Sequence, residues 1–158
     1  MEITENEAFR KLSAFCSSSE HCRSEVVEKM QRWGMPYDQI DRVADRLVVE
    51  SFIDEERYCR AFVNDKLRLE KWGKMKIRQA LYIKKIPQSV VFPFLNEIDD
   101  EEYLQVLRGV IHSKRKSVHA ADERERDAKL IRFAMSRGFE MADIRRCMEI
   151  PEDFEDEE

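Results

Sequence analysis

The sequence predicts an all-α fold of three tandem three-helix units, stacked into an elongated, curved, solenoid-like molecule. Charged residues make up 39% of the 158 residues, against about a quarter in an average soluble protein. Apolar side chains recur at helical spacing, and strand-like alternation is nearly absent. Helix starts, glycine stops and proline restarts also recur in the same order along the chain, which is typical of a helical repeat.

The first three-helix unit is expected over residues 4–51. Thr4 and Glu7 have the spacing of a capping box, which predicts a helix start at this point. Ser24 is expected to open a second helix, and Gly34 to end it before a third helix begins. The positions expected to face inward are Ala8, Leu12, Phe15, Val26, Val27, Met30, Ile40, Val43 and Leu47.

The second three-helix unit is expected over residues 52–98. Asp54 is expected to cap a long helix that breaks at Trp72-Gly73, and Pro87 restarts the chain after a second, shorter helix. Pro93 lies inside the third helix, which it should kink or shorten. The positions expected to face inward are Tyr58, Ala61, Phe62, Leu69, Ile77, Ala80, Leu81, Val91, Phe94 and Leu95.

The third three-helix unit is expected over residues 99–150, beginning at Asp99 and breaking at Gly138 before a last helix. An acidic tail follows over 151–158, where six of the seven residues after Pro151 are acidic. Such a run repels itself and is expected to be disordered. Two roles fit it: an electrostatic brake folded back over basic residues, or a solubilising tail. The inward positions are Tyr103, Val106, Leu107, Val110, Ala128, Ile131, Ala134, Met141, Ile144 and Met148.

The formal net charge of −5 conceals an uneven distribution. Residues 57–85 carry ten basic and two acidic side chains, a net charge of +8, between flanks of −6 and −7. This block predicts an anionic partner, either nucleic acid or an acidic protein surface. The candidate binding residues are Lys66, Arg68, Lys71, Lys74, Lys76, Arg78, Lys84 and Lys85.

Two further features near these cations have competing interpretations. Trp72 and Tyr82 are able to stack on bases, although for Trp72 we favour packing between helices. A second cationic group is interrupted by acids, so we expect a solvated helix whose charges pair with one another. This group comprises Lys114, Arg115, Lys116, Arg124 and Arg126.

Several classes of protein are excluded or disfavoured. The four glycines lie at least 29 residues apart, so neither common glycine-rich phosphate-binding loop can be drawn. Cys16, His21 and Cys22 form a cluster without a fourth metal ligand nearby, and no CxxC pair exists. We therefore expect no catalytic residues, no metal and no cofactor. No apolar stretch approaches the roughly 20 residues of a membrane helix, and no signal peptide is evident, so we expect a cytoplasmic protein.

Three segments together resemble the RecX family, the bacterial modulators of the RecA recombinase. Phe52–Val63 carries the family's Ile-Asp-Asp/Glu-x-Arg-Phe/Tyr pattern, and Trp72–Leu81 its Gly-x-x-x-Ile-x-x-x-Leu pattern, with Lys84-Lys85-Ile86 following. Cys22–Met30 is similar to a third family block. The chain departs from the family at Lys85, where glycine is usual, and at Cys59, where alanine is usual.

The resemblance implies three tandem three-helix units and a non-enzymatic role in DNA repair and the SOS response. It implies binding within the groove of RecA–DNA filaments, which limits ATP hydrolysis, filament growth and strand exchange. The expected partner is the RecA filament, with single- or double-stranded DNA as a further candidate, and we expect a monomer. Two alternatives stay open: a sequence-independent nucleic-acid-binding helical protein that does not contact RecA, and a helical adaptor for another acidic protein.

Overall fold

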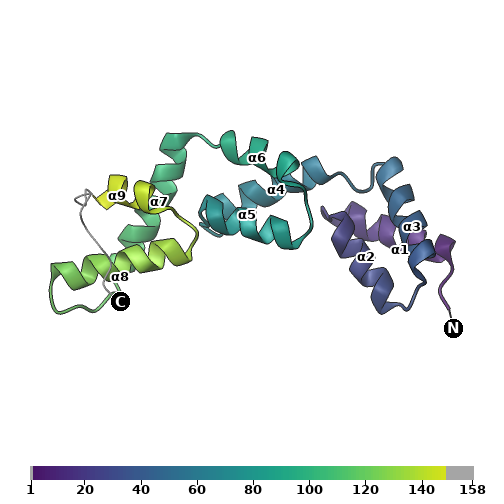
Figure 1. Cartoon of the computed structure of the whole chain (residues 1–158), viewed down its shortest axis with the longest axis horizontal. Helices are drawn as coiled ribbons and strands as arrows, with labels where there is room; N and C mark the ends of the chain where they lie inside the picture. The colour runs from purple at the N-terminus through teal and green to yellow at the C-terminus, as the bar shows by residue number, and fades with distance from the viewer. Residues whose placement is uncertain (1, 149–158) are drawn as a thin grey trace. The chain divides into compact units, whose positions relative to one another are not determined.

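The computed structural model describes residues 2–148, and all regular secondary structure in that range is helical (Figure 1). The all-α prediction is therefore confirmed. The acidic segment expected to be disordered, residues 151–158, lies outside the described residues, as do residues 149 and 150. The helices are α1 (Glu5–Ser18), α2 (Arg23–Arg32), α3 (Tyr37–Val49), α4 (Glu55–Arg68), α5 (Lys74–Ile83), α6 (Gln88–Asn96), α7 (Asp100–Arg115), α8 (Glu123–Ser136) and α9 (Met141–Met148).

The described chain forms two compact parts. The N-terminal part comprises residues 2–62 and 81–91, and the C-terminal part comprises residues 63–80 and 92–148. Helices α4, α5 and α6 each contribute residues to both parts. The predicted boundaries of three separate three-helix units stay a prediction. No helix between residues 2 and 148 has the length and apolar character needed to cross a membrane.

In the N-terminal part, α1 and α2 both pack against α3. The Thr4 hydroxyl accepts a hydrogen bond from the Glu7 N–H at 3.1 Å, as the cap predicts. Gly34 has a φ of +75° and ends α2, since this conformation favours glycine. The start of α2 was predicted wrongly at Ser24: the helix begins at Arg23. The core here comprises Ala8, Leu12, Cys16, Val26, Met30, Met35, Ile40, Val43, Ala44, Leu47 and Ile53.

The C-terminal part contains α7, α8 and α9, which pack on one another. The Asp99 carboxylate accepts from the Glu102 N–H at 3.0 Å, and the Asp122 carboxylate from the Glu125 N–H at 2.8 Å. These two caps fix where α7 and α8 begin. The buried side chains of these three helices and the loop at Phe139 are Tyr103, Leu104, Leu107, Val110, Ile111, Leu130, Ile131, Ala134, Phe139 and Ile144.

The middle of the chain differs from the sequence prediction at Leu69. Helix α4 ends at Arg68, before the predicted break, so Leu69 is 74% exposed rather than inward. Helix α6 contains Pro93 and ends at Asn96, three residues beyond it. Proline lacks only its own N–H, and near the end of a short helix this removes a single backbone hydrogen bond.

Candidate partner-binding surface

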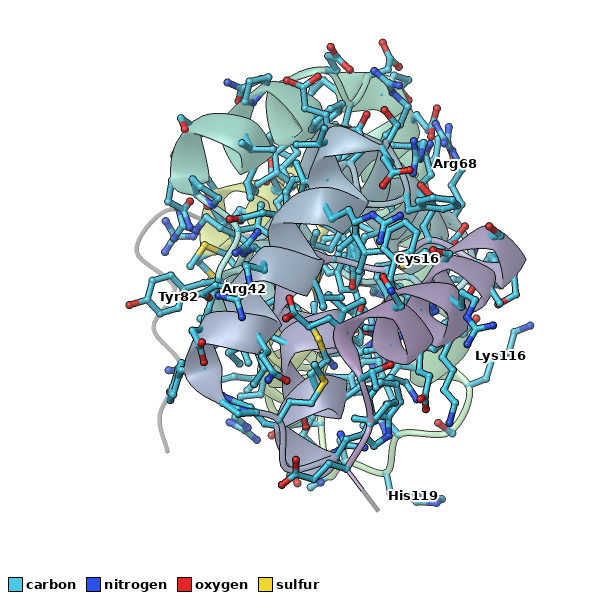
Figure 2. The ribbon with its side chains drawn as sticks, turned by 90° about the vertical axis from the view of Figure 1, so that its right-hand side faces the viewer. Cys16, Arg42, Arg68, Tyr82, Lys116 and His119 are labelled. Atoms are coloured by element: carbon cyan, nitrogen blue, oxygen red, sulfur yellow. The ribbon has the colours of Figure 1, made fainter. Side chains whose placement is uncertain are left out.

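The structure separates the eight predicted binding residues. Lys84 and Lys85 lie in the N-terminal part, and the other six lie in the C-terminal part. Tyr82, the aromatic residue considered for stacking, is 70% exposed and extends away from the ribbon (Figure 2). The charged stretch defined by the sequence is therefore divided between the two parts.

Trp72 is the centre of a small cationic cluster in the C-terminal part. The Lys66 and Lys76 ammonium groups lie 4.7 and 4.4 Å from the centroid of its indole ring. Both distances are within the range of a cation–π interaction. Trp72 itself is half-buried. The ring therefore does more than fill a gap between helices: it holds two positive charges close together, which creates a local attraction for anions.

Lys74 and Lys76 occupy the first turn of α5, and no acidic side chain is present in that turn. The Lys74 N–H donates to the Tyr103 hydroxyl at 2.9 Å, and its ammonium group lies 4.7 Å from the Tyr103 ring centroid. Burial raises the pKa of Tyr103 to about 12 despite the opposing effect of this hydrogen bond, so the phenol stays protonated. Cations at a helix N-terminus oppose the helix dipole. Helix stability therefore does not explain these two lysines.

Lys71 and Lys85 both have left-handed backbone conformations. Their φ angles are 60° and 63°, a region that costs a side-chain-bearing residue about 1 kcal/mol or more. At Lys85, the Ile86 N–H donates to the Leu81 carbonyl at 3.2 Å, as in a glycine-terminated helix end. Glycine adopts this conformation without strain, which fits the glycine that the family resemblance leads us to expect at position 85. Both lysine side chains are exposed.

Two of the predicted binding residues are engaged in ion pairs within the protein. Arg68 lies 2.7 Å from a Glu102 carboxylate oxygen, and the Lys84 ammonium 3.3 Å from a Glu25 carboxylate oxygen. Burial raises the pKa of Glu25, but the Cys22 N–H and Lys84 outweigh this effect and leave the pKa below its usual value. Arg68 and Lys84 therefore have structural partners that the sequence did not reveal.

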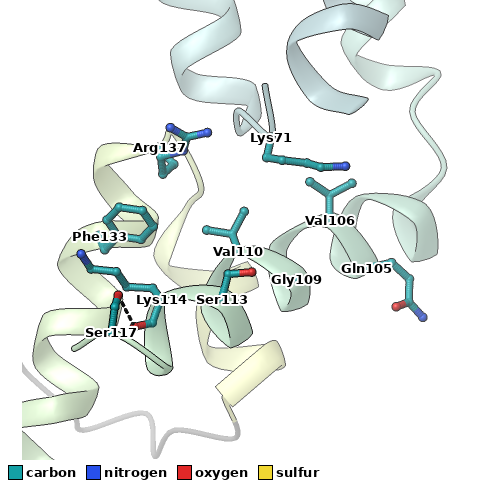
Figure 3. A pocket seen from close by; sticks show the side chains of 10 residues that line it. All are labelled: Lys71, Gln105, Val106, Gly109, Val110, Ser113, Lys114, Ser117, Phe133 and Arg137. Carbon is teal, nitrogen blue, oxygen red and sulfur yellow. Dashed lines mark hydrogen bonds between the residues drawn. The ribbon is translucent and has the colours of Figure 1, made fainter. Parts of the chain in front are cut away.

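The C-terminal part also contains a hollow of about 520 Å³ that the sequence does not predict (Figure 3). Lys71 lines it together with Lys114 and Arg137, over a floor that includes Val110 and Phe133. Lys114 was expected to belong to a self-paired helix, but its ammonium lies 4.7 Å from the Phe133 ring centroid instead. No local pattern indicates the hollow, because its cations come from three distant segments.

The cysteine and histidine cluster noted in the sequence packs as a structural element. Cys16 and Cys22 are buried, and burial raises the pKa of both thiols, to about 11 for Cys16, so both are protonated at neutral pH. The His21 ring stacks on Phe15 with centroids 3.6 Å apart. Within residues 2–148, no group of three or more His, Cys, Asp or Glu side chains is arranged to hold a metal ion.

These features describe a helical protein with a cationic candidate surface, and comparisons with known proteins identify its class. Residues 54–91 match the model of the RecX second three-helix domain, and residues 100–148 match the model of the RecX third three-helix domain. Together the two matches cover more than half of the chain. The chain belongs to the RecX family.

Curated relatives agree with this assignment. The chain is 31% identical over 145 residues to the regulatory protein RecX of Chlorobium limicola. The matched region covers 92% of this chain and 89% of that protein. It is 36% identical over 131 residues to the regulatory protein RecX of Pseudomonas fluorescens. This match covers 82% of this chain and 81% of that protein.

Solved structures support the fold. A crystal structure of regulatory protein RecX matches with a TM-score of 0.84 at 18% identity, covering 92% of this chain and 72% of that one. The crystal structure of RecX from Lactobacillus salivarius matches with a TM-score of 0.79 at 17% identity, covering 92% of this chain and 94% of that one.

Proposed function

We propose that this protein is a non-catalytic, cytoplasmic regulator that binds RecA–DNA filaments as a monomer and limits their ATP hydrolysis, growth and strand exchange. The observation that carries the proposal is its membership of the RecX family, whose members with 31% and 36% identity to this chain are named regulatory protein RecX. The division into three-helix units over residues 4–51, 52–98 and 99–150 is part of this proposal.

The placement of four lysines supports a binding role for the basic block. Lys74 and Lys76 lie at a helix N-terminus, where the helix dipole disfavours cations. Lys71 and Lys85 hold left-handed conformations in which glycine would be less strained. These lysines each have a structural cost, and a requirement for positive charge at a partner surface explains why lysine is present. Filament acids or DNA phosphates are the anions that they would contact.

ATP hydrolysis by the cognate RecA on single-stranded DNA tests the proposal. We would titrate wild-type protein against preformed filaments, beside the variants K74E/K76E and R10E/K11E. Both variants change the net charge from −5 to −9, so they differ only in where the charge is placed. Glutamate is favoured in the first turn of a helix, so K74E/K76E is expected to stay folded, which thermal unfolding would verify.

The proposal expects substoichiometric inhibition by the wild type and by R10E/K11E, and much weaker inhibition by K74E/K76E. Inhibition that appears only near DNA-coating ratios, and that excess DNA relieves, would overturn the RecA contact in favour of a sequence-independent nucleic-acid-binding protein. Such a protein would also lose affinity steeply with salt. If folded wild-type protein does not inhibit at any ratio, the proposed function is wrong.

A further inference from the structure

Two adjoining hollows lie along α7 in the C-terminal part, and we call them together the α7 groove. The first is the hollow of about 520 Å³ already described, lined by Lys71, Lys114 and Arg137 (Figure 3). The second measures about 430 Å³ and is lined by Arg108, His112, Arg115 and Cys147, among others. Gln105 and Gly109 line both hollows, so the two meet on the surface of α7 at these residues.

Gly109 leaves the helix surface bare at the point where the hollows meet. It lies within the sixteen-residue helix α7 and is exposed, and a Cβ added to it would meet nothing within 4 Å. Internal packing therefore does not require glycine there. Glycine is a weak helix former, and alanine would be more stable. A remaining physical reason for glycine is the close approach of another chain to the backbone.

The lining of the α7 groove is strongly cationic and contains no acidic side chain among the described residues. Within residues 2–148, Lys71, Lys114 and Arg115 form no ion pair with an acid. Arg137 donates to the Glu70 backbone carbonyl, and Arg108 alone pairs with an acid, Glu101, at 3.0 Å. The groove is therefore suited to an anionic chain. The floor of Val106, Val110 and Phe133 offers it an apolar contact.

The chain itself carries a matching segment immediately after α9. Residues 149–158 contain seven acidic side chains, no basic one, and the apolar residues Ile150 and Phe154. The segment follows Met148 directly, and the preceding Cys147 lines the second hollow. Ten extended residues reach about 33 Å, whereas Gln105 and Arg115 lie only about 15 Å apart along a helix. The segment therefore starts at the edge of the groove and is long enough to cross it.

We propose that residues 149–158 bind in the α7 groove of their own chain, crossing α7 at Gly109. The acidic side chains pair with Lys71, Lys114 and Arg115, and Phe154 contacts the floor beside Phe133. Tethering makes the local concentration of the segment high, roughly millimolar for a short linker, so modest contacts suffice. Because Lys71 also belongs to the candidate partner surface, the bound segment would compete with an anionic partner; only this consequence depends on the proposed function.

Amide NMR spectra of the full chain at low salt test the proposal without RecA. One variant neutralises four acids of the segment: Glu152→Gln, Asp153→Asn, Glu155→Gln and Asp156→Asn. A charge-matched control neutralises four acids of the N-terminal part: Glu2→Gln, Glu28→Gln, Asp41→Asn and Asp45→Asn. We expect the amide signals of Gly109, Ser113 and Lys114 to move in the first variant and stay in place in the control.

A second pair of variants tests the crossing point. Gly109→Gln fills the bare surface with a good helix former and should release the segment, so that the signals of residues 152–158 sharpen. Met135→Gln, at an exposed position on α8 outside the groove, should leave those signals unchanged. The α7 groove signals should also be independent of protein concentration.

Three outcomes would overturn the proposal. The first is groove signals that do not respond to neutralisation of the segment. The second is a response that weakens on dilution, which would assign the segment to the groove of a second copy. The third is that the groove signals do not respond to changes in residues 149–158 but do shift when a separate acidic peptide or a single-stranded oligonucleotide is added. This result would assign the groove to a partner.

Discussion

The backbones of Gly73 and Gly138 lie in direct contact in the C-terminal part. A Cβ on Gly73 would lie 2.3 Å from the Gly138 carbonyl carbon, and a Cβ on Gly138 only 2.5 Å from the Cβ of Lys76. The Gly73 N–H donates to the Arg137 carbonyl at 2.7 Å, and the Met75 N–H to the Gly138 carbonyl at 3.0 Å. The start of α5 is thereby held against the α8–α9 turn.

Gly73→Ala is expected to destabilise the protein because the added methyl group has no room. Overpacking of this kind costs about 2 kcal/mol, and here the obstructing atoms are backbone, which cannot rotate away. Urea unfolding followed by circular dichroism would measure the loss. Gly34→Ala serves for comparison: Gly34 has open space around it, so its substitution should cost only the strain of its positive φ, about 1 kcal/mol, which is less than the cost at Gly73. A Gly73→Ala variant as stable as wild type would show that the two backbones separate without cost.

Gly109→Ala is expected to have the opposite effect. The position is exposed, within a helix, and open to a Cβ, so the substitution should raise the free energy of unfolding by about 1 kcal/mol. The same urea titration measures this gain. A loss of stability would mean that the proposed contact of residues 149–158 at Gly109 contributes more to stability than the gain in helix propensity. Gly73 and Gly109 differ in this way because backbone atoms enclose Gly73, whereas the space beside Gly109 is open.

The difference between Gly73 and Gly109 shows that local features of the fold could be predicted from the sequence, whereas contacts between distant segments could not. Thr4 and Asp54 were predicted as caps, and each accepts a hydrogen bond from the backbone N–H three residues further along the chain. Gly73 was assigned to a helix break and does lie between α4 and α5, but the sequence did not reveal its contact with Gly138. Its partner Gly138 lies 65 residues further along the chain, and no local pattern reports such a contact.

The candidate site shows the same limit. Net charge is additive along a segment, so the basic block was evident from composition alone. The fate of each cation depends on its partner in space: Lys84 pairs with Glu25, 59 residues away, and Arg68 with Glu102, 34 residues away. Lys114 and Arg137 join Lys71 only after folding. The sequence therefore leads to an expectation of an anionic partner, but it does not reveal which cations the fold leaves available to that partner.

Lys85→Gly is expected to separate stability from binding. Glycine relieves the left-handed strain at a φ of 63°, which should raise the free energy of unfolding by about 1 kcal/mol. It also removes an exposed positive charge of the proposed partner surface, so inhibition of RecA ATP hydrolysis should weaken. Lys85→Asn, which tolerates this conformation while removing the charge, should weaken inhibition to a similar degree. A stabilised variant with full inhibition would remove Lys85 from the surface.

Glu25→Gln is expected to lower stability in a pH-dependent manner. The Glu25 carboxylate accepts from the Cys22 N–H at 3.0 Å and lies 3.3 Å from the Lys84 ammonium. Burial opposes the charged form, but these two contacts outweigh it and lower the pKa below 4.5. A lowered carboxyl pKa stabilises the folded state above the unfolded pKa, and this stabilisation is lost as the pH falls through the folded pKa.

At neutral pH the free energy of unfolding of the wild type should therefore be about 1 kcal/mol higher than that of Glu25→Gln, which is the usual contribution of a helix cap. The difference should shrink once the pH falls below 4.5. Urea titrations at several pH values would measure it, with Glu56→Gln, at an exposed position on α4, as a control. Lys84→Gln combined with Glu25→Gln should cost less than the two changes summed. Full additivity would mean that Lys84 is not held by Glu25 and is available to a partner.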